Sequence, residues 1–285
     1  MNRHKHHSDV METPITTRSG RLSTEQVARY RTEGYLKYDE PIFPKAKFEG
    51  LRQHFDLKLA ALSPDVRPEA MDVPHFNDTK LFEWLFADEV LDLVQPIIGP
   101  DIVLFSSHFI CKPKGNGKRV PWHEDSYYWR DMLSPMEVCT VWLAVDSSTT
   151  ENGCMNVIPR THDHGFSEYE DVDLAKNVFP TEIQKHQFDP AKAVAIELQQ
   201  NQASLHDGKL MHGSEANTSA IRRCGYTMRY VPSHVVLNEA NYSKVHHLYL
   251  ARGRDRSNGA NKYADPAKCY PEMARYRESQ SRNFH

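Results

Sequence analysis

The chain has 285 residues, of which 39% are hydrophobic and 26% are charged. This composition can build a packed core and excludes the low-hydrophobicity class of disordered proteins. The net charge of -3 and the pI near 6.6 exclude a strongly basic surface of the kind that binds nucleic acid or an anionic membrane, so small-molecule chemistry is the expected class of function.

Residues 1–20 form a polar segment without apolar periodicity, and we expect a flexible leader there. Order is expected to begin near Leu22, and residues 21–285 suit one large domain. The amino terminus lacks the apolar core of a secretory signal, and no stretch approaches the roughly 20 apolar residues of a membrane span. The sequence therefore indicates a cytoplasmic protein.

Helices are predicted in the first third of the chain. Ser23 and Gln26 have the spacing of a capping box, and the helix that they open should end at Gly34. Apolar residues at helical spacing predict two further helices, from Lys45 to about Leu62 and from Asp88 to Ile98.

After Gly99 the pattern changes to short runs of β-branched and aromatic residues that predict strands. Helices followed by many antiparallel strands favour a mainly β fold with flanking helices, either a barrel or a double-sheet jelly roll. The predicted strands are Ile102–Lys112, Val120–Asp125, Val138–Asp146, Met155–Ile158, Val194–Leu198, Ala203–Leu205 and Cys224–Val231, and the segment after about Val235 is predicted as loop and short helix.

The cysteines are odd in number, widely spaced and without a CxxC pair. This pattern favours buried free thiols over disulfides or a zinc site. The five residues are Cys111, Cys139, Cys154, Cys224 and Cys269.

One short motif points to a metal. In Pro-Trp-His123-Glu-Asp125 the two candidate ligands are two residues apart at the end of a predicted strand, so both side chains should project from one face. His212 is a later candidate for a third ligand. Two imidazoles and one carboxylate leave the opposite face of an ion open, which is the arrangement of non-haem iron(II) oxygenases. The alternative is a chance tripeptide with ordinary surface or core histidines.

Arg222 and Arg223 open the strand that follows His212. Adjacent strand residues point to opposite faces, so only one of the two guanidinium groups can enter the barrel. A buried guanidinium requires a carboxylate partner. The alternative interpretation is a pair of surface arginines.

With these neighbours, the chain resembles the phytanoyl-CoA dioxygenase family from about Leu22 to Val235. The resemblance rests on Leu-Ser-Thr-Glu-Gln-Val-Ala-Arg-Tyr-Arg-Thr-Glu-Gly-Tyr near the start, Ile-Cys-Lys112-Pro, His123-Glu-Asp125, the run from Val-Trp142-Leu-Ala-Val through Asn152-Gly153 to Pro159-Arg160-Thr-His162, His212-Gly-Ser214-Glu-Ala-Asn217, and Arg223.

This resemblance implies a double-stranded β-helix (jelly roll, cupin-like) with iron(II) at His123, Asp125 and His212, and with 2-oxoglutarate and dioxygen as co-substrates. It also implies that Arg223 and Ser214 bind the distal carboxylate of 2-oxoglutarate, with Trp142 and His108 lining that pocket. Halogenating relatives have a small residue in place of the ligand carboxylate, so the presence of Asp125 favours hydroxylation.

Two positions depart from the family pattern. The usual Gly-Ser-His after Val-Ile-Pro is here Arg160-Thr161-His162, and the position of His108 is more often apolar or another polar residue. Neither position belongs to the triad, so the departures bear on the substrate.

Candidate substrate residues follow the metal motif. Tyr127 and Trp129 should form part of the cavity rim, and Trp129 corresponds to the substrate-contacting tryptophan of the related ectoine hydroxylase; the alternative is simple packing. The acidic segment with Tyr169, Glu170 and Asp171 suits a cationic group, although a solvated loop has the same composition. Arg160 and Arg229 are candidates to bind an anionic end.

This pattern is similar to that of family members that hydroxylate small zwitterions, including 2-aminoethylphosphonate and its N-methylated forms. An acyl-CoA or a secondary metabolite remains an alternative substrate. A barrel that binds a metal without oxygenating anything is an alternative of a different class.

Overall fold

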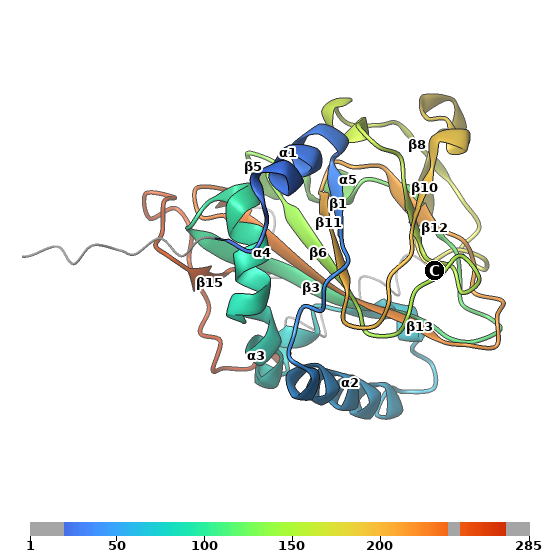
Figure 1. Ribbon diagram of the computed structural model, residues 1–285, viewed down its shortest axis with the longest axis horizontal. Coiled ribbons are helices and arrows are strands. Elements are labelled where there is room, and N and C mark those ends of the chain that lie inside the picture. The colour runs from blue at the N-terminus through green and yellow to red at the C-terminus, as the bar shows by residue number, and fades with distance from the viewer. Residues whose placement is uncertain (1–19, 239–245, 272–285) are drawn as a thin grey trace, which may run out of the picture.

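The computed structural model describes residues 20–238 and 246–271, which include two β-sheets that face each other (Figure 1). The larger, seven-stranded sheet has the order β1-β11-β6-β13-β3-β15, with β2 pairing with β3, and the smaller has the order β10-β7-β12-β4. All of these pairs are antiparallel, which confirms the predicted jelly roll.

The strands of the larger sheet are β1 (Tyr35–Tyr38), β2 (Met71–Asp72), β3 (Ile102–Lys112), β6 (Cys139–Ala144), β11 (Ala203–Asp207), β13 (Arg223–Pro232) and β15 (Tyr249–Arg252). Those of the smaller sheet are β4 (Val120–His123), β7 (Met155–Val157), β10 (Val194–Ile196) and β12 (His212–Ser214). Two short antiparallel pairs are added by β8 (Tyr169–Asp171) with β9 (Thr181–Ile183), and by β5 (Leu133–Ser134) with β14 (Val236–Leu237).

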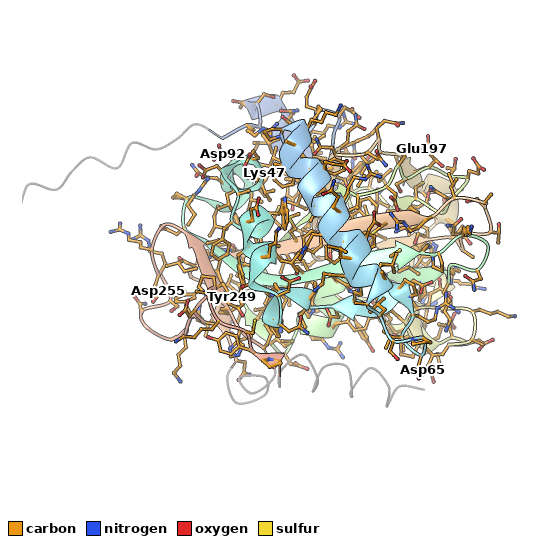
Figure 2. All side chains as sticks on the ribbon, turned by 90° about the horizontal axis from the view of Figure 1, so that it is seen from below. Lys47, Asp65, Asp92, Glu197, Tyr249 and Asp255 are labelled. Atoms are coloured by element: carbon orange, nitrogen blue, oxygen red, sulfur yellow. The ribbon has the colours of Figure 1, made fainter. Side chains whose placement is uncertain are left out.

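Helices cover the outer face of the larger sheet. They are α1 (Thr24–Glu33), α2 (Lys45–Ala60), α3 (Phe82–Leu85) and α4 (Asp88–Ile98), and Figure 2 shows α2 lying across the strands. Their apolar faces share one buried cluster with the outward side chains of the sheet, as where Phe55 of α2 joins Phe109 of β3 and Tyr226 of β13. Short 3-10 helices lie at Pro68–Ala70, Pro74–Phe76, Thr79–Leu81, Thr161–Asp163, Lys185–Gln187 and Pro190–Lys192.

Strand β13 is buried on both faces, and its side chains divide by alternation. Cys224, Tyr226, Met228 and Tyr230 pack with the helices in the outer cluster. Arg223, Gly225, Thr227 and Arg229 therefore point inward, toward the smaller sheet. The outer core thus fixes which polar residues enter the space between the sheets.

The structure confirms the three predicted helices. Ser23 and Gln26 form the capping box, and Gly34 ends α1 in the left-handed region with φ 80°. The helix at 45 ends at Ala60, slightly before the predicted end, and Pro96 lies inside α4. Across the described residues, no helix is long and apolar enough to cross a membrane.

Three predictions of local structure were wrong. The strand predicted to end at Asp125 ends at His123, because Asp125 begins a one-turn helix, α5 (Asp125–Trp129). The acidic segment around Glu170 forms strand β8 and not a loop, and β15 lies where loop and short helix were predicted. Both strands are only three or four residues long and are stabilised by pairing, β8 with β9 and β15 with β3, which local sequence does not show.

The cysteine prediction is confirmed for four of the five residues, which are buried and free. Cys269 is also free but exposed. Most of the predicted leader, as well as residues 239–245 and 272–285 of the predicted C-terminal loop region, lie outside the described residues.

A glycine on the inward face of β13 allows Trp142 to lie across the sheet. A Cβ atom at Gly225 would lie 2.0 Å from Cζ2 of Trp142. We expect Gly225→Ala to lower the free energy of unfolding by about 1–3 kcal/mol, because the indole must move within a packed interior. The matched control is Gly50→Ala inside α2, where the nearest atom is 3.7 Å away. It should raise stability by about 0.5–1 kcal/mol. Urea unfolding of both variants measures this, and equal effects would contradict the packing argument.

Candidate metal centre

Three buried side chains from three elements converge between the sheets. His123 ends β4, Asp125 begins α5 and His212 begins β12, and one ligand atom from each lies within 4.8 Å of the others. His123 and His212 face each other in the register of β4 and β12. The structure thus brings together the three residues that the sequence predicted, although Asp125 reaches the site from a helix.

Both imidazoles are oriented by backbone carbonyls. Nδ1 of His123 lies 2.8 Å from the carbonyl oxygen of Pro121, and Nδ1 of His212 lies 2.9 Å from that of Leu210. A proton on Nδ1 satisfies these contacts and leaves the lone pair of Nε2 for a metal. Burial lowers the pKa of both rings, that of His212 well below its ordinary value, which favours the neutral form that binds metals.

Asp125 is a buried carboxylate with one cationic neighbour. Burial tends to raise its pKa, but the charge of Arg229, followed by the proximity of His206 and His212, holds the pKa well below its ordinary value. Nε of Arg229 donates to Oδ2 of Asp125 at 3.2 Å, and Nη2 lies 3.5 Å from Oδ1. The carboxylate is therefore ionised and ready to bind a cation.

A second group of polar side chains contains two cations, Lys112 and Arg223, which we call the buried cation pair. The hydroxyl of Ser214 lies between them. Nζ of Lys112 donates to Oγ of Ser214 at 2.7 Å, and Nη2 of Arg223 donates to the same oxygen at 3.2 Å. Arg223 also donates to the carbonyl oxygen of Gly153. Among the described residues, neither cation has a carboxylate within ion-pair distance.

Burial affects the protonation of both groups. Burial, and then the nearby Arg223, lowers the pKa of Lys112 well below its ordinary value. Burial lowers the pKa of Arg223 itself to about 10. Nζ of Lys112 also donates to the carbonyl oxygens of Ser214 and Glu215, so both buried cations meet only neutral acceptors. Such a pair is a candidate site for an anion.

The aromatic wall of this anion site is Trp142. The guanidinium carbon of Arg223 lies 5.4 Å from the centre of its ring. His108 lies in the same cross-strand row as Trp142, with Thr227 between them, and its Nε2 is 2.8 Å from the carbonyl oxygen of Glu69. Arg222 points away and pairs with Asp146 and Asp56, so the register predicted for the two arginines is confirmed.

The segment after the triad forms an aromatic group anchored to the metal motif. Tyr127 and Tyr169 stack with their ring centres 3.6 Å apart, and the hydroxyl of Tyr169 accepts the backbone N–H of Glu124 at 2.9 Å. The carboxylate of Glu124 accepts from Ser167 at 2.6 Å. Trp129 is buried, and the guanidinium carbon of Arg229 lies 5.1 Å from its ring centre.

The remaining candidate substrate residues lie at the surface. Glu170 and Asp171 are exposed on β8, the same strand as Tyr169. Arg160 is exposed and pairs with Glu33 at 2.7 Å, at the end of α1. The structure therefore does not bring Arg160 together with the triad.

Two residues near the site were given no role from the sequence. Lys112 was part of a recognised motif, and alternation from His108 along β3 could have placed it on the inward face. His206 was missed because the predicted strand stopped one residue before it. Its Nε2 lies 3.9 Å from Oδ2 of Asp125, and its ring centre is 4.8 Å from that of His212.

A sequence model of the phytanoyl-CoA dioxygenase family matches residues 22–225 of this chain. The relatives include a phytanoyl-CoA dioxygenase domain-containing protein 1 homolog of Dictyostelium discoideum, 27% identical over 160 residues that cover 55% of this chain and 56% of the relative. Human peroxisomal phytanoyl-CoA dioxygenase is 28% identical over 146 residues, which cover 50% of this chain and 43% of the relative. The chain spans about half the length of these curated relatives.

Solved structures support the fold. A non-heme monooxygenase, ThoJ in its apo form, superposes with a TM-score of 0.71 at 21% identity, covering 91% of this chain and 98% of ThoJ. CytC3 in complex with Fe(II) and alpha-ketoglutarate gives a TM-score of 0.62 at 22% identity, covering 85% of this chain and 93% of CytC3.

The depressed pKa of Lys112 predicts a pH dependence of stability. Its ordinary value is 10.5, and the folded value lies below this, so in the window between them the unfolded chain binds one more proton. The free energy of unfolding therefore rises with pH there. We expect the free energy of unfolding of the wild type to rise relative to that of Lys112→Met as the pH increases through this window, by up to about 1.4 kcal/mol per pH unit. Denaturant titrations in carboxylate-free buffers measure it, and a difference that is constant with pH up to 10.5 would mean that Lys112 is not buried.

Proposed function

We propose, because this chain belongs to the phytanoyl-CoA dioxygenase family, that it is an iron(II)- and 2-oxoglutarate-dependent oxygenase that hydroxylates a small molecule. The observation that carries the proposal is the buried cation pair, Lys112 and Arg223, which has no carboxylate partner in the described part of the chain and lies beside a His-Asp-His triad. A metal barrel without an anionic co-substrate does not require these two buried charges.

The spacing of the two groups fits a short dicarboxylate. Ser214 lies two residues after His212, which corresponds to about 7 Å along a strand. An anion at Ser214 and Arg223 is therefore close enough for the other end of a five-carbon diacid to reach the triad. This fit supports the proposal that Arg223, Ser214 and Lys112 bind the distal carboxylate of 2-oxoglutarate, with Trp142 and His108 lining the pocket.

The residues of the site then have distinct roles in binding the metal and the co-substrate. His123, Asp125 and His212 would hold iron(II), which together with 2-oxoglutarate and dioxygen supplies the oxidising chemistry. The neutral imidazoles and the ionised carboxylate need no proton rearrangement before the metal binds. The triad and Arg223 are buried, which keeps bulk water from the reacting groups.

The charge around the centre bears on the substrate. The cationic side chains that contact the triad or Ser214 are Lys112, Arg223 and Arg229. The buried carboxylates beside them are those of Asp125 and of Glu124, which lies between the two ligands in the sequence. Iron(II) and the dianion of 2-oxoglutarate add charges that cancel, so the loaded centre retains an excess of positive charge. An anionic group on the substrate would reduce this excess.

The opposite charge lies on the β8 strand. Tyr127 and Tyr169 form a stacked aromatic pair, and the exposed carboxylates of Glu170 and Asp171 are on the same strand as Tyr169. Aromatic faces with carboxylates suit an ammonium group. We therefore propose a small zwitterion as the substrate, such as 2-aminoethylphosphonate or an N-methylated form, with an acyl-CoA or a secondary metabolite as the alternative.

The direct test of the proposed activity is the anaerobic addition of iron(II) and 2-oxoglutarate. An oxygenase of this class should show a visible charge-transfer band that needs both components. Succinate formation is then measured with 2-aminoethylphosphonate, its N-trimethyl form, ectoine and an acyl-CoA. A protein without the band, even with iron bound, is not a 2-oxoglutarate oxygenase.

The two neighbouring arginines provide a matched pair of variants. Arg223→Ala removes one partner of a buried charge interaction, which typically costs about 2–5 kcal/mol, so 2-oxoglutarate should bind roughly 30-fold to several thousand-fold more weakly. Arg222→Ala, which loses only the outward contacts with Asp146 and Asp56, should change little. Arg223→Lys keeps the charge but loses the fork and should be intermediate. Anaerobic titration of the charge-transfer band measures all three, and equal effects at 222 and 223 would refute the assignment of the pocket.

The acidic strand has its own test. Asp171→Asn and Glu170→Gln should raise the Michaelis constant for an amine substrate by about two- to fivefold each, because exposed charges contribute roughly 0.5–1 kcal/mol. Affinity for 2-oxoglutarate should not change. Asp163→Asn, an exposed carboxylate outside β8, is the control. If the three variants behave alike, β8 is only a solvated surface.

A further inference from the structure

The two oxygens of Asp125 have different surroundings. Oδ1 lies 3.8 Å from Nε2 of His123, the nitrogen whose lone pair is available for the metal. Oδ2 receives the shorter contact from Arg229, at 3.2 Å, and lies 3.9 Å from Nε2 of His206. The contact of Arg229 with Oδ1, at 3.5 Å, is at the limit of a hydrogen bond and contributes little.

Arg229 and His206 reach the same oxygen because of the sheet register. Both are paired with Thr140, Arg229 from β13 on one side and His206 from β11 on the other. The three residues form one cross-strand row on the inward face of the larger sheet. Asp125, on α5, lies against the two ends of this row.

The two contacts differ in how they are supported. The guanidinium of Arg229 is held against the ring of Trp129, which ends the same helix that Asp125 begins. His206 is almost fully buried, and neither of its ring nitrogens has a hydrogen-bond partner among the described residues. A buried polar group without a partner costs about 1–3 kcal/mol. The imidazole of His206, whose Nε2 lies 3.9 Å from Oδ2 of Asp125, would therefore be stabilised if this separation shortened to that of a hydrogen bond.

We propose that Arg229 and His206 hold Oδ2 of Asp125 and thereby reserve Oδ1 for the metal, so that the carboxylate binds through one oxygen. This inference rests on the proposed function. A carboxylate that bound through both oxygens would occupy a position that 2-oxoglutarate or dioxygen requires on the ion. Arg229, expected from the sequence to bind the anionic end of the substrate, is here a positioning residue that acts through Asp125.

The experiment compares two variants with one control. His206→Phe removes the ring nitrogens and keeps a flat ring, and Arg229→Lys keeps the positive charge but loses the Nε donor. Thr140→Val is the control, because Thr140 lies between the two residues and its hydroxyl has no partner in the described part of the chain. The readouts are iron(II) affinity, 2-oxoglutarate affinity from the charge-transfer band, and near-infrared magnetic circular dichroism, which distinguishes a saturated ion from one with an open position.

We expect both variants to bind 2-oxoglutarate about 10- to 100-fold more weakly, the range in which outer-shell residues affect metal sites. Their iron(II) affinity should stay within about tenfold of the wild type, because the three ligands are unchanged. Their ligand-field spectra should show a metal with one fewer exchangeable position. Thr140→Val should match the wild type in every readout.

Parallel losses of iron(II) affinity and thermal stability, with an unchanged spectrum of the bound ion, would overturn the proposal, because Arg229 and His206 would then serve only the fold. A wild type without the charge-transfer band would refute the proposed function instead. The cobalt(II) spectra of the same variants would then decide whether Oδ2 is held.

Discussion

The structure depends on how charge is compensated on the inward face of a doubly buried strand. Strand β13 packs against helices on its outer face, so its alternation forces Arg223 and Arg229 into the space between the sheets. Taking a guanidinium out of water is costly unless an anion is nearby. Arg229 meets this requirement through Asp125, whereas Arg223 meets only neutral oxygens. The difference between the two arginines distinguishes the metal triad from the proposed anion site.

The apolar parts of the fold determine where these charged side chains lie. The helices and the outward side chains form one buried cluster that fixes the register of the larger sheet, and a shift of one residue would exchange its two faces. The smaller sheet adds His123 and His212 from adjacent strands. The triad is therefore built by β4 and α5, which are adjacent in the sequence, and by β12, which follows much later. Its geometry depends on the pairing of β12 with β4 as well as on the local His-x-Asp motif.

The sequence predicted the parts of the site that depend on local pattern. The register of Arg222 and Arg223 followed from alternation, and the metal motif from the spacing of His123 and Asp125. The helical placement of Asp125 was missed because residues two apart share one face of a strand, which already accounts for a shared metal. In the structure, a helical turn begins at Asp125 and still brings its side chain close to that of His123. The contact between Arg229 and Asp125 was not predictable, because it depends on which strands become neighbours. Lys112 was overlooked as a site residue because lysine is almost never fully buried.

The most direct test of the central claim is anaerobic crystallography of the protein with iron(II) and 2-oxoglutarate, using the anomalous signal of iron. The account predicts one ion bound by His123, Oδ1 of Asp125 and His212, with the distal carboxylate of 2-oxoglutarate on Arg223 and Ser214. An ion outside the triad, or a 2-oxoglutarate molecule that leaves Arg223 without an anionic partner, would contradict it.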